Sequence, residues 1–222
     1  MLLKEAEWIN TQIEKLPAGM ETNFCVNLGS STSDFVMESQ PYIFDLVVNP
    51  LASKFKKVIN VDIKDAQGVD LIANFLTAEG RSDILKIKPK VYLVSNLLEH
   101  IPSPTQGAES LISMLRPGDI LILTGPRFYP FHPDPIDNKF RPSRQELKKI
   151  FSRNFKILKL EYVWGGSVLT ANRYSVSKTD LYLWSKRQLS FRNVLQNPKH
   201  ILRTLRNVFY PAVAFCGVFE KL

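Results

Sequence analysis

Cysteine, histidine and long apolar runs are all scarce in this sequence. Two cysteines among 222 residues give no support to a scaffold built on disulfides or to a structural zinc site. Cys25 and Cys216 each lie inside an apolar, strand-like run, which predicts buried free thiols. The three histidines leave few imidazole groups for acid–base chemistry near neutral pH.

The sequence also contains no run of residues that predicts a membrane-spanning helix. No stretch reaches the roughly 18 uncharged apolar residues that such a helix needs. The first 16 residues mix acids and bases in helical alternation, unlike a secretory leader. We therefore expect a cytoplasmic protein. Its composition, 45% hydrophobic and 23% charged, is typical of one globular domain spanning residues 1–222.

Acidic residues are scarce in the last third of the chain. Residues 1–150 hold 17 Lys and Arg against 18 Asp and Glu, whereas residues 151–222 hold 12 against 3. Within the latter, the segment 186–206 carries six basic residues and no acid. Such a segment favours phosphate groups, an anionic membrane surface or nucleic acid as a partner. A solvated helical face is the plainer alternative.

Strand-like and helix-like runs alternate along the chain. Helices are expected within the first 20 residues and at 41–55, 105–115 and 143–151. Strands are expected at 23–28, 57–62, 69–73, 91–95, 119–124, 155–164 and 212–220. This alternation predicts an α/β fold, with a mostly parallel sheet and helices on both faces. Because ligands bind beyond the carboxyl ends of strands in such sheets, the loops that follow strands are the places to look for a site.

Polar residues follow the first three expected strands. Gly29 permits a tight turn after the first strand, and the serine hydroxyls after it can bind a polar ligand end, although a plain turn is the alternative. Asp62 ends the second strand, where a carboxylate can accept both hydroxyls of a ribose; a solvated strand end is the alternative. Asn74 follows the third strand, where its amide could pair with an adenine edge.

The most specific motifs surround the fourth and fifth strands. They are "SNLLEHIPSP" at residues 95–104, "LRPGD" at 115–119 and a Thr-x-Pro at 124–126. In this order they resemble the class I S-adenosylmethionine-dependent methyltransferases, especially the branch that acts on small molecules, over roughly residues 24–151. The resemblance implies a Rossmann-like, seven-stranded sheet whose last strand is antiparallel, and S-adenosylmethionine as the cofactor.

The resemblance also implies roles for particular residues. Gly29 matches the glycine of the first cofactor loop, Asn27 stands where the family usually has an acid, and Ser31 and Ser33 replace later glycines. Asp62 matches the ribose-binding acid. The complete implied set of cofactor-binding residues is Asn27, Gly29, Ser30, Ser31, Asp62, Ile63, Asn74, Ser95 and Asn96. His100, in the "LLEHI" part of the motif, is either a structural or a catalytic residue.

The stretch "GPRFYPFHPDPIDNKFRP" at residues 125–142 is rich in proline, which excludes a continuous helix and a central strand and predicts a shaped loop. The resemblance places this loop beside the acceptor pocket. His132 is the best candidate for a general base, and Asp134 could orient it or act instead. Two alternatives stay open. His132, Asp134 and Asp137 could hold a divalent cation, or the loop could be a rigid wall in which one of the aspartates pairs with Arg141.

If the last strand is 212–220, residues 165–210 form a basic insertion or lid between the sixth and seventh strands; the alternative puts a strand at 180–185. The function implied is methyl transfer, at an oxygen, to a small molecule or glycan that carries phosphate or a lipid, with possible membrane contact through 186–206. One alternative is a nucleic-acid methyltransferase, which the lack of an Asn-Pro-Pro-Tyr segment after the fourth strand disfavours. Another is a protein that keeps the fold and binds without catalysis, which the Ser31 and Ser33 departures suggest.

Overall fold

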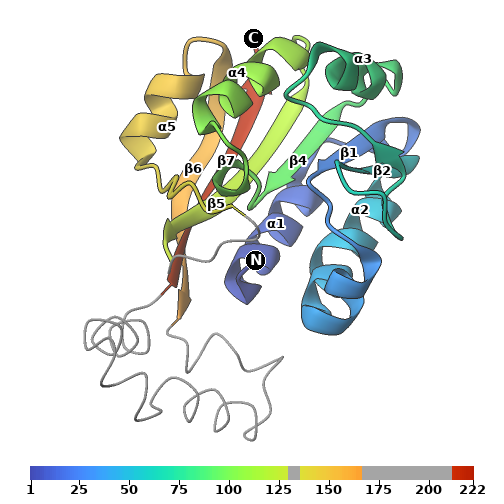
Figure 1. The fold of residues 1–222 in the computed structure, drawn as a ribbon, viewed down its shortest axis with the longest axis horizontal. Helices are drawn as coiled ribbons and strands as arrows, with labels where there is room; N and C mark the ends of the chain where they lie inside the picture. The colour runs from blue at the N-terminus through green and yellow to red at the C-terminus, as the bar shows by residue number, and fades with distance from the viewer. Residues whose placement is uncertain (130–135, 167–211) are drawn as a thin grey trace, which may run out of the picture.

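The computed structural model of the protein describes residues 1–129, 136–166 and 212–222. One seven-stranded sheet runs through it in the spatial order β3-β2-β1-β4-β5-β7-β6 (Figure 1). The first six strands run parallel to one another, and β7 pairs antiparallel with both β5 and β6. The predicted α/β fold with an antiparallel last strand is confirmed.

The bounds of the elements are as follows. The strands are β1 (Phe24–Leu28), β2 (Lys57–Asp62), β3 (Leu71–Ile72), β4 (Val91–Ser95), β5 (Ile120–Phe128), β6 (Phe155–Gly166) and β7 (Ala212–Lys221). The α-helices are α1 (Leu3–Lys15), α2 (Asn49–Lys54), α3 (Ala78–Lys86), α4 (Pro104–Met114) and α5 (Arg144–Phe151). Short helical turns are η1 (Met20–Thr22), η2 (Phe35–Ser39), η3 (Phe44–Val48) and η4 (Leu98–His100).

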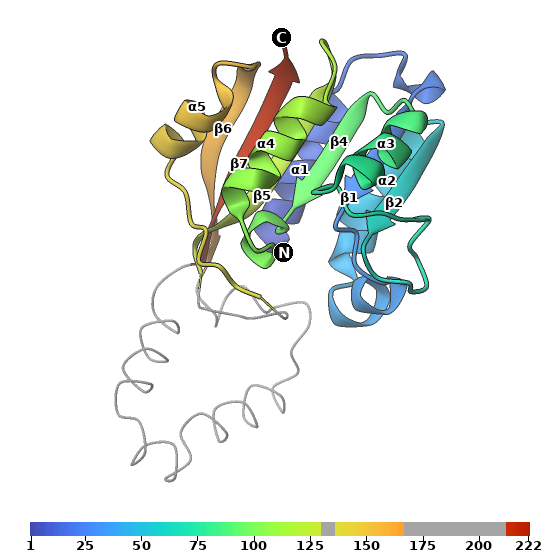
Figure 2. The ribbon, with the colours of Figure 1, turned by 45° about the horizontal axis from the view of Figure 1, so that its top comes forward.

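Alternate strand residues build two hydrophobic cores, one on each face of the sheet. In β4, Tyr92 and Val94 belong to one core and Val91 and Leu93 to the other, because successive side chains of a strand point to opposite faces. Helices α3, α4 and α5 cover the first core, and α1 and α2 cover the second (Figure 2). Both faces of β4 are therefore buried, as its unbroken apolar run indicates.

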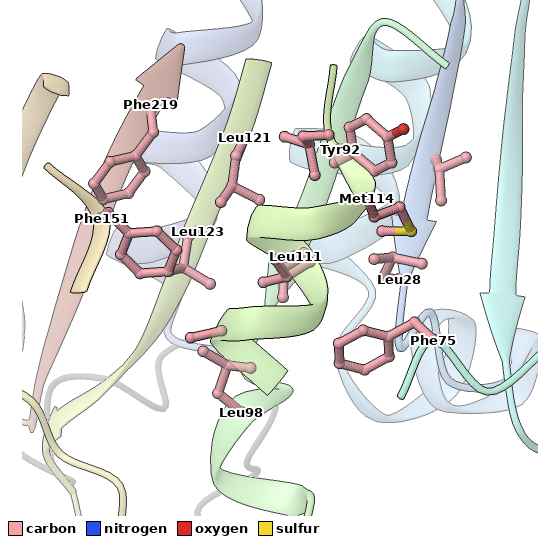
Figure 3. Packing of buried hydrophobic residues seen from close by; sticks show 14 of the residues in the cluster. Leu28, Phe75, Tyr92, Leu98, Leu111, Met114, Leu121, Leu123, Phe151 and Phe219 are labelled. Atoms are coloured by element: carbon pink, nitrogen blue, oxygen red, sulfur yellow. The ribbon is translucent and has the colours of Figure 1, made fainter. Parts of the chain in front are cut away.

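The first core packs large side chains from helix and strand together. It includes Leu111 and Met114 of α4 and the rings of Phe151 and Phe219, whose centroids lie 5.0 Å apart (Figure 3). Burying one such side chain fully is worth about 1.5–3 kcal/mol of transfer free energy. This packing holds the sheet rigid, so that the ends of its strands can position a site.

Helix α3 is an element that the sequence pattern hides. It buries just Gly80 and Ile84, so its apolar face is too narrow to produce a clear helical period. A cap marks its start, since Thr77 Oγ1 accepts a hydrogen bond from the Gly80 amide at 3.1 Å. Strand β3, by contrast, is shorter than the predicted 69–73.

The helix predicted at 41–55 is irregular. Its middle is the π-helical turn η3, and regular α-helix begins at α2. Pro50 lies in the first turn of α2 and has no amide hydrogen to donate to the preceding turn, which accounts for the irregular junction.

The strand predicted at 119–124 is longer than expected and enters the proline-rich stretch at residues 125–142 as an edge strand, so the exclusion of a central strand there holds. Strand β5 continues to Phe128, and Gly125 and Pro126 pair with Phe215 and Ala214 of β7. The neighbouring strand β4 ends opposite Thr124, so β5 is an edge strand beyond this point. Proline is tolerated at an edge, and the register shift after Pro126 is a further sign that the ladder is irregular there.

The end of the chain confirms the placement of the seventh strand at 212–220, which β7 includes. Strand β6 continues to Gly166, so residues 165 and 166 belong to the strand and not to the predicted insertion. The rest of that insertion, with the basic segment 186–206 and the alternative strand at 180–185, lies outside the described residues.

Cys25 and Cys216 are buried and free, as predicted. Burial raises the pKa of both thiols well above its usual range. Among the helices that the structure describes, none combines the length and the apolar character needed to cross a bilayer.

Candidate functional site

A cavity of about 600 Å³ lies at the carboxyl ends of the parallel strands. The order of the sheet reverses between β1 and β4, and ligands bind at such a switch point in open α/β sheets. All the predicted site residues that the structure describes line this cavity: Asn27, Gly29, Ser30, Ser31, Asp62, Ile63, Asn74, Ser95, Asn96 and His100. Their roles stay predictions. His132 and Asp134 lie outside the described residues.

The cavity has two sides that are built differently. The loops after β1, β2 and β3 form the wall that we call the β1–β3 side. The ends of β4 and β5 and the start of α1 form the wall that we call the β4–β5 side. The amino-terminal end of α1 reaches the same edge of the sheet as the ends of β4 and β5 (Figures 1 and 2).

Asp62 joins two loops on the β1–β3 side. Its Oδ2 accepts a hydrogen bond from the Ser31 amide at 3.1 Å, and its Oδ1 accepts one from the Lys64 amide at 3.1 Å. The amide of Gly29 also donates to the Val61 carbonyl at 2.8 Å. The loop after β1 is therefore fixed on the end of β2, and Asp62 faces the cavity with lone pairs to spare, since a carboxylate has about four acceptor sites.

The loop after β1 adopts a glycine-like backbone although serine replaces a glycine in it. Gly29 has φ +71° and Ser31 has φ +60°, both in the left-handed region. A Cβ atom on Gly29 would lie 2.7 Å from Leu97 Cδ1, so the loop after β4 packs closely against this turn. Ser31 holds the unfavourable conformation through its bond to Asp62.

Two asparagines complete the β1–β3 side. Asn27 Nδ2 donates to Asn60 Oδ1 at 3.1 Å and so links β1 to β2. Asn74 Oδ1 accepts from the Leu76 amide at 3.0 Å, which closes a turn before α3. Helix α3 packs tightly on this turn, because a Cβ atom on Gly80 would lie 2.0 Å from the Asn74 carbonyl oxygen.

The β4–β5 side is organised around a buried carboxylate. Glu5 is 1% exposed and lines the cavity. Its Oε1 accepts hydrogen bonds from Asn96 Nδ2 at 2.7 Å and from Thr124 Oγ1 at 2.6 Å, and its Oε2 accepts one from the Leu2 amide at 3.1 Å. Asn96 has φ +49°, so Glu5 also fixes a left-handed residue at the end of β4.

A second carboxyl group lies deeper on this side. Glu99 is 1% exposed, and its Oε1 makes no hydrogen bond within the part of the chain that the structure describes. Burial, reinforced by the charge of Glu5, raises the pKa of Glu99 to about 8, although Arg141 and the amino terminus act in the opposite direction. Glu99 is therefore mostly protonated at neutral pH.

His100 connects this side to the second half of the proline-rich stretch. Its Nδ1 lies 2.6 Å from the Ile136 carbonyl oxygen, which can only accept, so Nδ1 carries a proton. Its Nε2 lies 3.9 Å from Glu99 Oε1. The neighbouring Asn138 donates from Nδ2 to the carbonyls of Leu98 and Ile101, at 2.7 and 2.8 Å. These bonds support a bracing role for His100.

Asp137 is the member of the predicted metal-binding trio that lies within the described residues, and it pairs with an arginine. Asp137 accepts two hydrogen bonds from the Arg141 guanidinium, at 3.1 and 2.8 Å, and one from the Lys139 amide at 2.9 Å. This pairing is the one expected of a rigid wall. No group of three or more His, Cys, Asp or Glu able to hold a metal ion is found among residues 1–129, 136–166 and 212–222.

Glu5 is a site residue that the sequence reasoning missed. An acid in a helix of alternating charge is normally solvated, and nothing in its neighbours marks it as buried. One weak signal exists: Glu5 stands at the third helical position, where a glutamate commonly caps the helix start, and its carboxylate does accept the Leu2 amide.

No family model and no curated protein matches the sequence. Solved structures do match the fold. An S-adenosylmethionine-dependent methyltransferase from Anabaena variabilis is 12% identical, with a TM-score of 0.57 over 100% of this chain and 88% of that one. One from Archaeoglobus fulgidus is 13% identical, with a TM-score of 0.51 over 97% and 94%.

A third match carries a different printed activity. The [4+2]-cyclase SpnF is 10% identical, with a TM-score of 0.55 over 97% of this chain and 81% of that one. Similarities at such low identity bear on the fold and not on the reaction. Together with the strand order and the antiparallel β7, they establish that this chain has the class I methyltransferase fold.

Proposed function

We propose that the protein is an S-adenosylmethionine-dependent methyltransferase that acts on a small-molecule acceptor. The observation that carries the proposal is that ten residues predicted from the sequence, near the ends of four strands, line one cavity at the switch point of the sheet. A plain structural role for each of these residues would not require them to share a cavity.

The residues present fit the cofactor. Asp62 offers carboxylate oxygens for ribose hydroxyls, and Asn74, which lines the same cavity, carries an amide that suits an adenine edge. The hydroxyls of Ser30 and Ser31 and the ends of β4 at Ser95 and Asn96 suit the amino-acid portion. Bound S-adenosylmethionine supplies a methyl group that its sulfonium already activates. The tasks left to the chain are to hold the two reactants in line and to exclude water.

The finer form of the proposal is transfer to an oxygen of a small molecule or glycan, with a phosphate or lipid portion held by residues 186–206. Oxygen transfer requires that a proton leave the acceptor hydroxyl, so a base must lie within about 2.6–3.2 Å of it. His132 stays the predicted base, and Asp134 stays the residue that could orient it or act instead. Among the described residues, the bonds of His100 favour a bracing role.

The first experiment is calorimetry with S-adenosylmethionine, and we expect binding in the micromolar range, as is common for enzyme substrates. Failure to bind at millimolar cofactor would reject the proposal. The second is incubation with cofactor labelled at the methyl group and a cell extract fractionated into lipid-linked glycans, free metabolites and RNA. Label in the first two fractions supports the small-molecule or glycan acceptor.

Two other functions have distinct outcomes in these experiments. Label in RNA, with binding that weakens steeply as salt rises, would favour nucleic-acid methylation. Cofactor binding without transfer to any fraction would favour a protein that keeps the fold for another purpose.

A further inference from the structure

The buried carboxylate of Glu5 has no cation paired with it. No Lys, Arg, His or terminal amine lies within 4.0 Å of it in the part of the chain that the structure describes. Nearby cations are engaged elsewhere, since Arg141 pairs with Asp137 and the amino terminus donates to Gln40. Three hydrogen bonds stabilise the carboxylate in part, but a buried carboxylate is stabilised much more strongly by a positively charged partner.

The ionisable neighbours of Glu5 do not share its charge. Burial first, and the charge of Glu5 second, raise the pKa of Glu99 to about 8 and the pKa values of the Tyr42 and Tyr129 phenols above their usual range. These groups are held mainly in neutral form at pH 7. The shifts thus leave the ionisable groups around the Glu5 carboxylate neutral.

Glu5 lines the cavity where β4 and β5 meet its wall. Its Oε1 accepts hydrogen bonds from Asn96 at the end of β4 and from Thr124 of β5. Within the described residues, its Oε2 accepts one hydrogen bond, from the Leu2 amide. A carboxylate oxygen has about two acceptor sites, so Oε2 can accept one further donor from a ligand. A cation there would complete the charge balance of this wall.

We propose that Glu5 is a specificity residue that selects a cationic group at the reacting end of the cavity. This inference rests on the proposed function. The groups that Glu5 would favour are the sulfonium of the cofactor and an acceptor whose reacting end is neutral or an ammonium. An acceptor with an anionic reacting end would be disfavoured. A phosphate elsewhere on the acceptor is unaffected, because the selection acts where Glu5 lies.

The test compares three ligands that share most of their structure. S-adenosylmethionine carries a sulfonium, sinefungin carries an ammonium in its place, and S-adenosylhomocysteine is neutral there. Calorimetry should show that the wild-type protein binds both cationic ligands more tightly than the neutral one. In Glu5→Gln, this preference should fall about ten-fold, the size expected for one charge contact in a partly screened site.

Thr124→Val is the matched control. It removes one hydrogen bond to Glu5 and keeps the charge, and Thr124 does not line the cavity. The control should therefore keep the wild-type preference, and thermal melting of each variant verifies its fold. Equal weakening of all three ligands in Glu5→Gln overturns the inference but leaves the proposed function intact.

The wild-type protein alone also decides the matter if Glu5→Gln does not fold. Tighter binding of S-adenosylhomocysteine than of both cationic ligands overturns the inference. Failure of the wild-type protein to bind any of the three ligands rejects the proposed function itself, so the two failures are distinct.

Discussion

The two sides of the cavity are shaped by different forces. On the β1–β3 side, backbone conformation and backbone hydrogen bonds set the geometry, as in the bonds from Ser31 and Lys64 to Asp62. On the β4–β5 side, two buried carboxyl groups, Glu5 and Glu99, set it. Changes of shape should therefore damage the first side most, and changes of charge or pH the second.

The largest effect is expected from Asp62→Ala on the β1–β3 side. This change releases the Ser31 and Lys64 amides and removes the proposed ribose contact. We expect S-adenosylmethionine binding to weaken about 100-fold, or roughly 2.7 kcal/mol, by calorimetry. Asp65→Ala, an exposed acid of the same loop that does not line the cavity, should bind normally. Less than three-fold loss in Asp62→Ala would contradict a cofactor site at this wall.

The two sides also differ in how far the sequence predicts them. The β1–β3 side could be predicted because its residues directly follow strands, and a strand ends where its apolar run ends. Asp62 and Asn74 were placed by that reasoning alone. Glu5 could not be placed in the same way, because its position depends on hydrogen bonds with Asn96 and Thr124, which are 91 and 119 residues away in the sequence. Local pattern carries no information about such contacts.

The same contrast explains the errors in the fold. Strand β5 can continue into the proline-rich stretch because β4 ends opposite Thr124, which leaves that edge of β5 free of strand pairing. The length of the neighbouring strand β4 cannot be inferred from the sequence of β5 itself. Helix α3 could not be predicted from its sequence pattern, because it contains Gly80, a poor helix former. The close contact of α3 with the turn at Asn74 requires that glycine.

That contact makes Gly80→Ala the next most damaging change. Alanine usually favours a helix over glycine by about 1 kcal/mol, but here its Cβ would lie 2.0 Å from the Asn74 carbonyl oxygen. Because backbone must shift, we expect a net loss of about 2–3 kcal/mol in the free energy of unfolding, measured by denaturant titration. Ser82→Ala, on an exposed position of the same helix, is the control. Unchanged or increased stability of Gly80→Ala would show that shape does not limit this side.

On the β4–β5 side, pH should matter instead. Burial raises the pKa of Glu99 from an ordinary value of 4.5 to about 8, so the folded protein binds more protons than the unfolded chain between these values. The free energy of unfolding must then fall as the pH rises from about 4.5 to 8. Glu99→Gln cannot titrate and removes this term. At pH 8.5 it should be more stable than wild type by on the order of 2 kcal/mol, or about 4–8 °C in Tm.

The control for Glu99→Gln is Glu109→Gln, which changes an exposed acid of α4. Its stability should follow the wild-type pH profile. If Glu99→Gln also runs parallel to wild type between pH 5 and 8.5, buried charge is not what distinguishes the β4–β5 side.

The smallest effects are expected from replacing the left-handed residues that are not glycine, Ser31 on the β1–β3 side and Asn96 on the β4–β5 side. These two replacements compare the sides directly. Ser31→Gly relieves a strain of about 1 kcal/mol but loosens the unfolded chain by a similar amount, so its stability should be near wild type. Asn96→Gly relieves strain too, but it removes the 2.7 Å bond to Glu5 and leaves a buried carboxylate short of one donor. We expect a net loss of about 1 kcal/mol by denaturant titration. If the two variants lose the same stability, then the backbone conformation, and not the charge of Glu5, governs both walls alike.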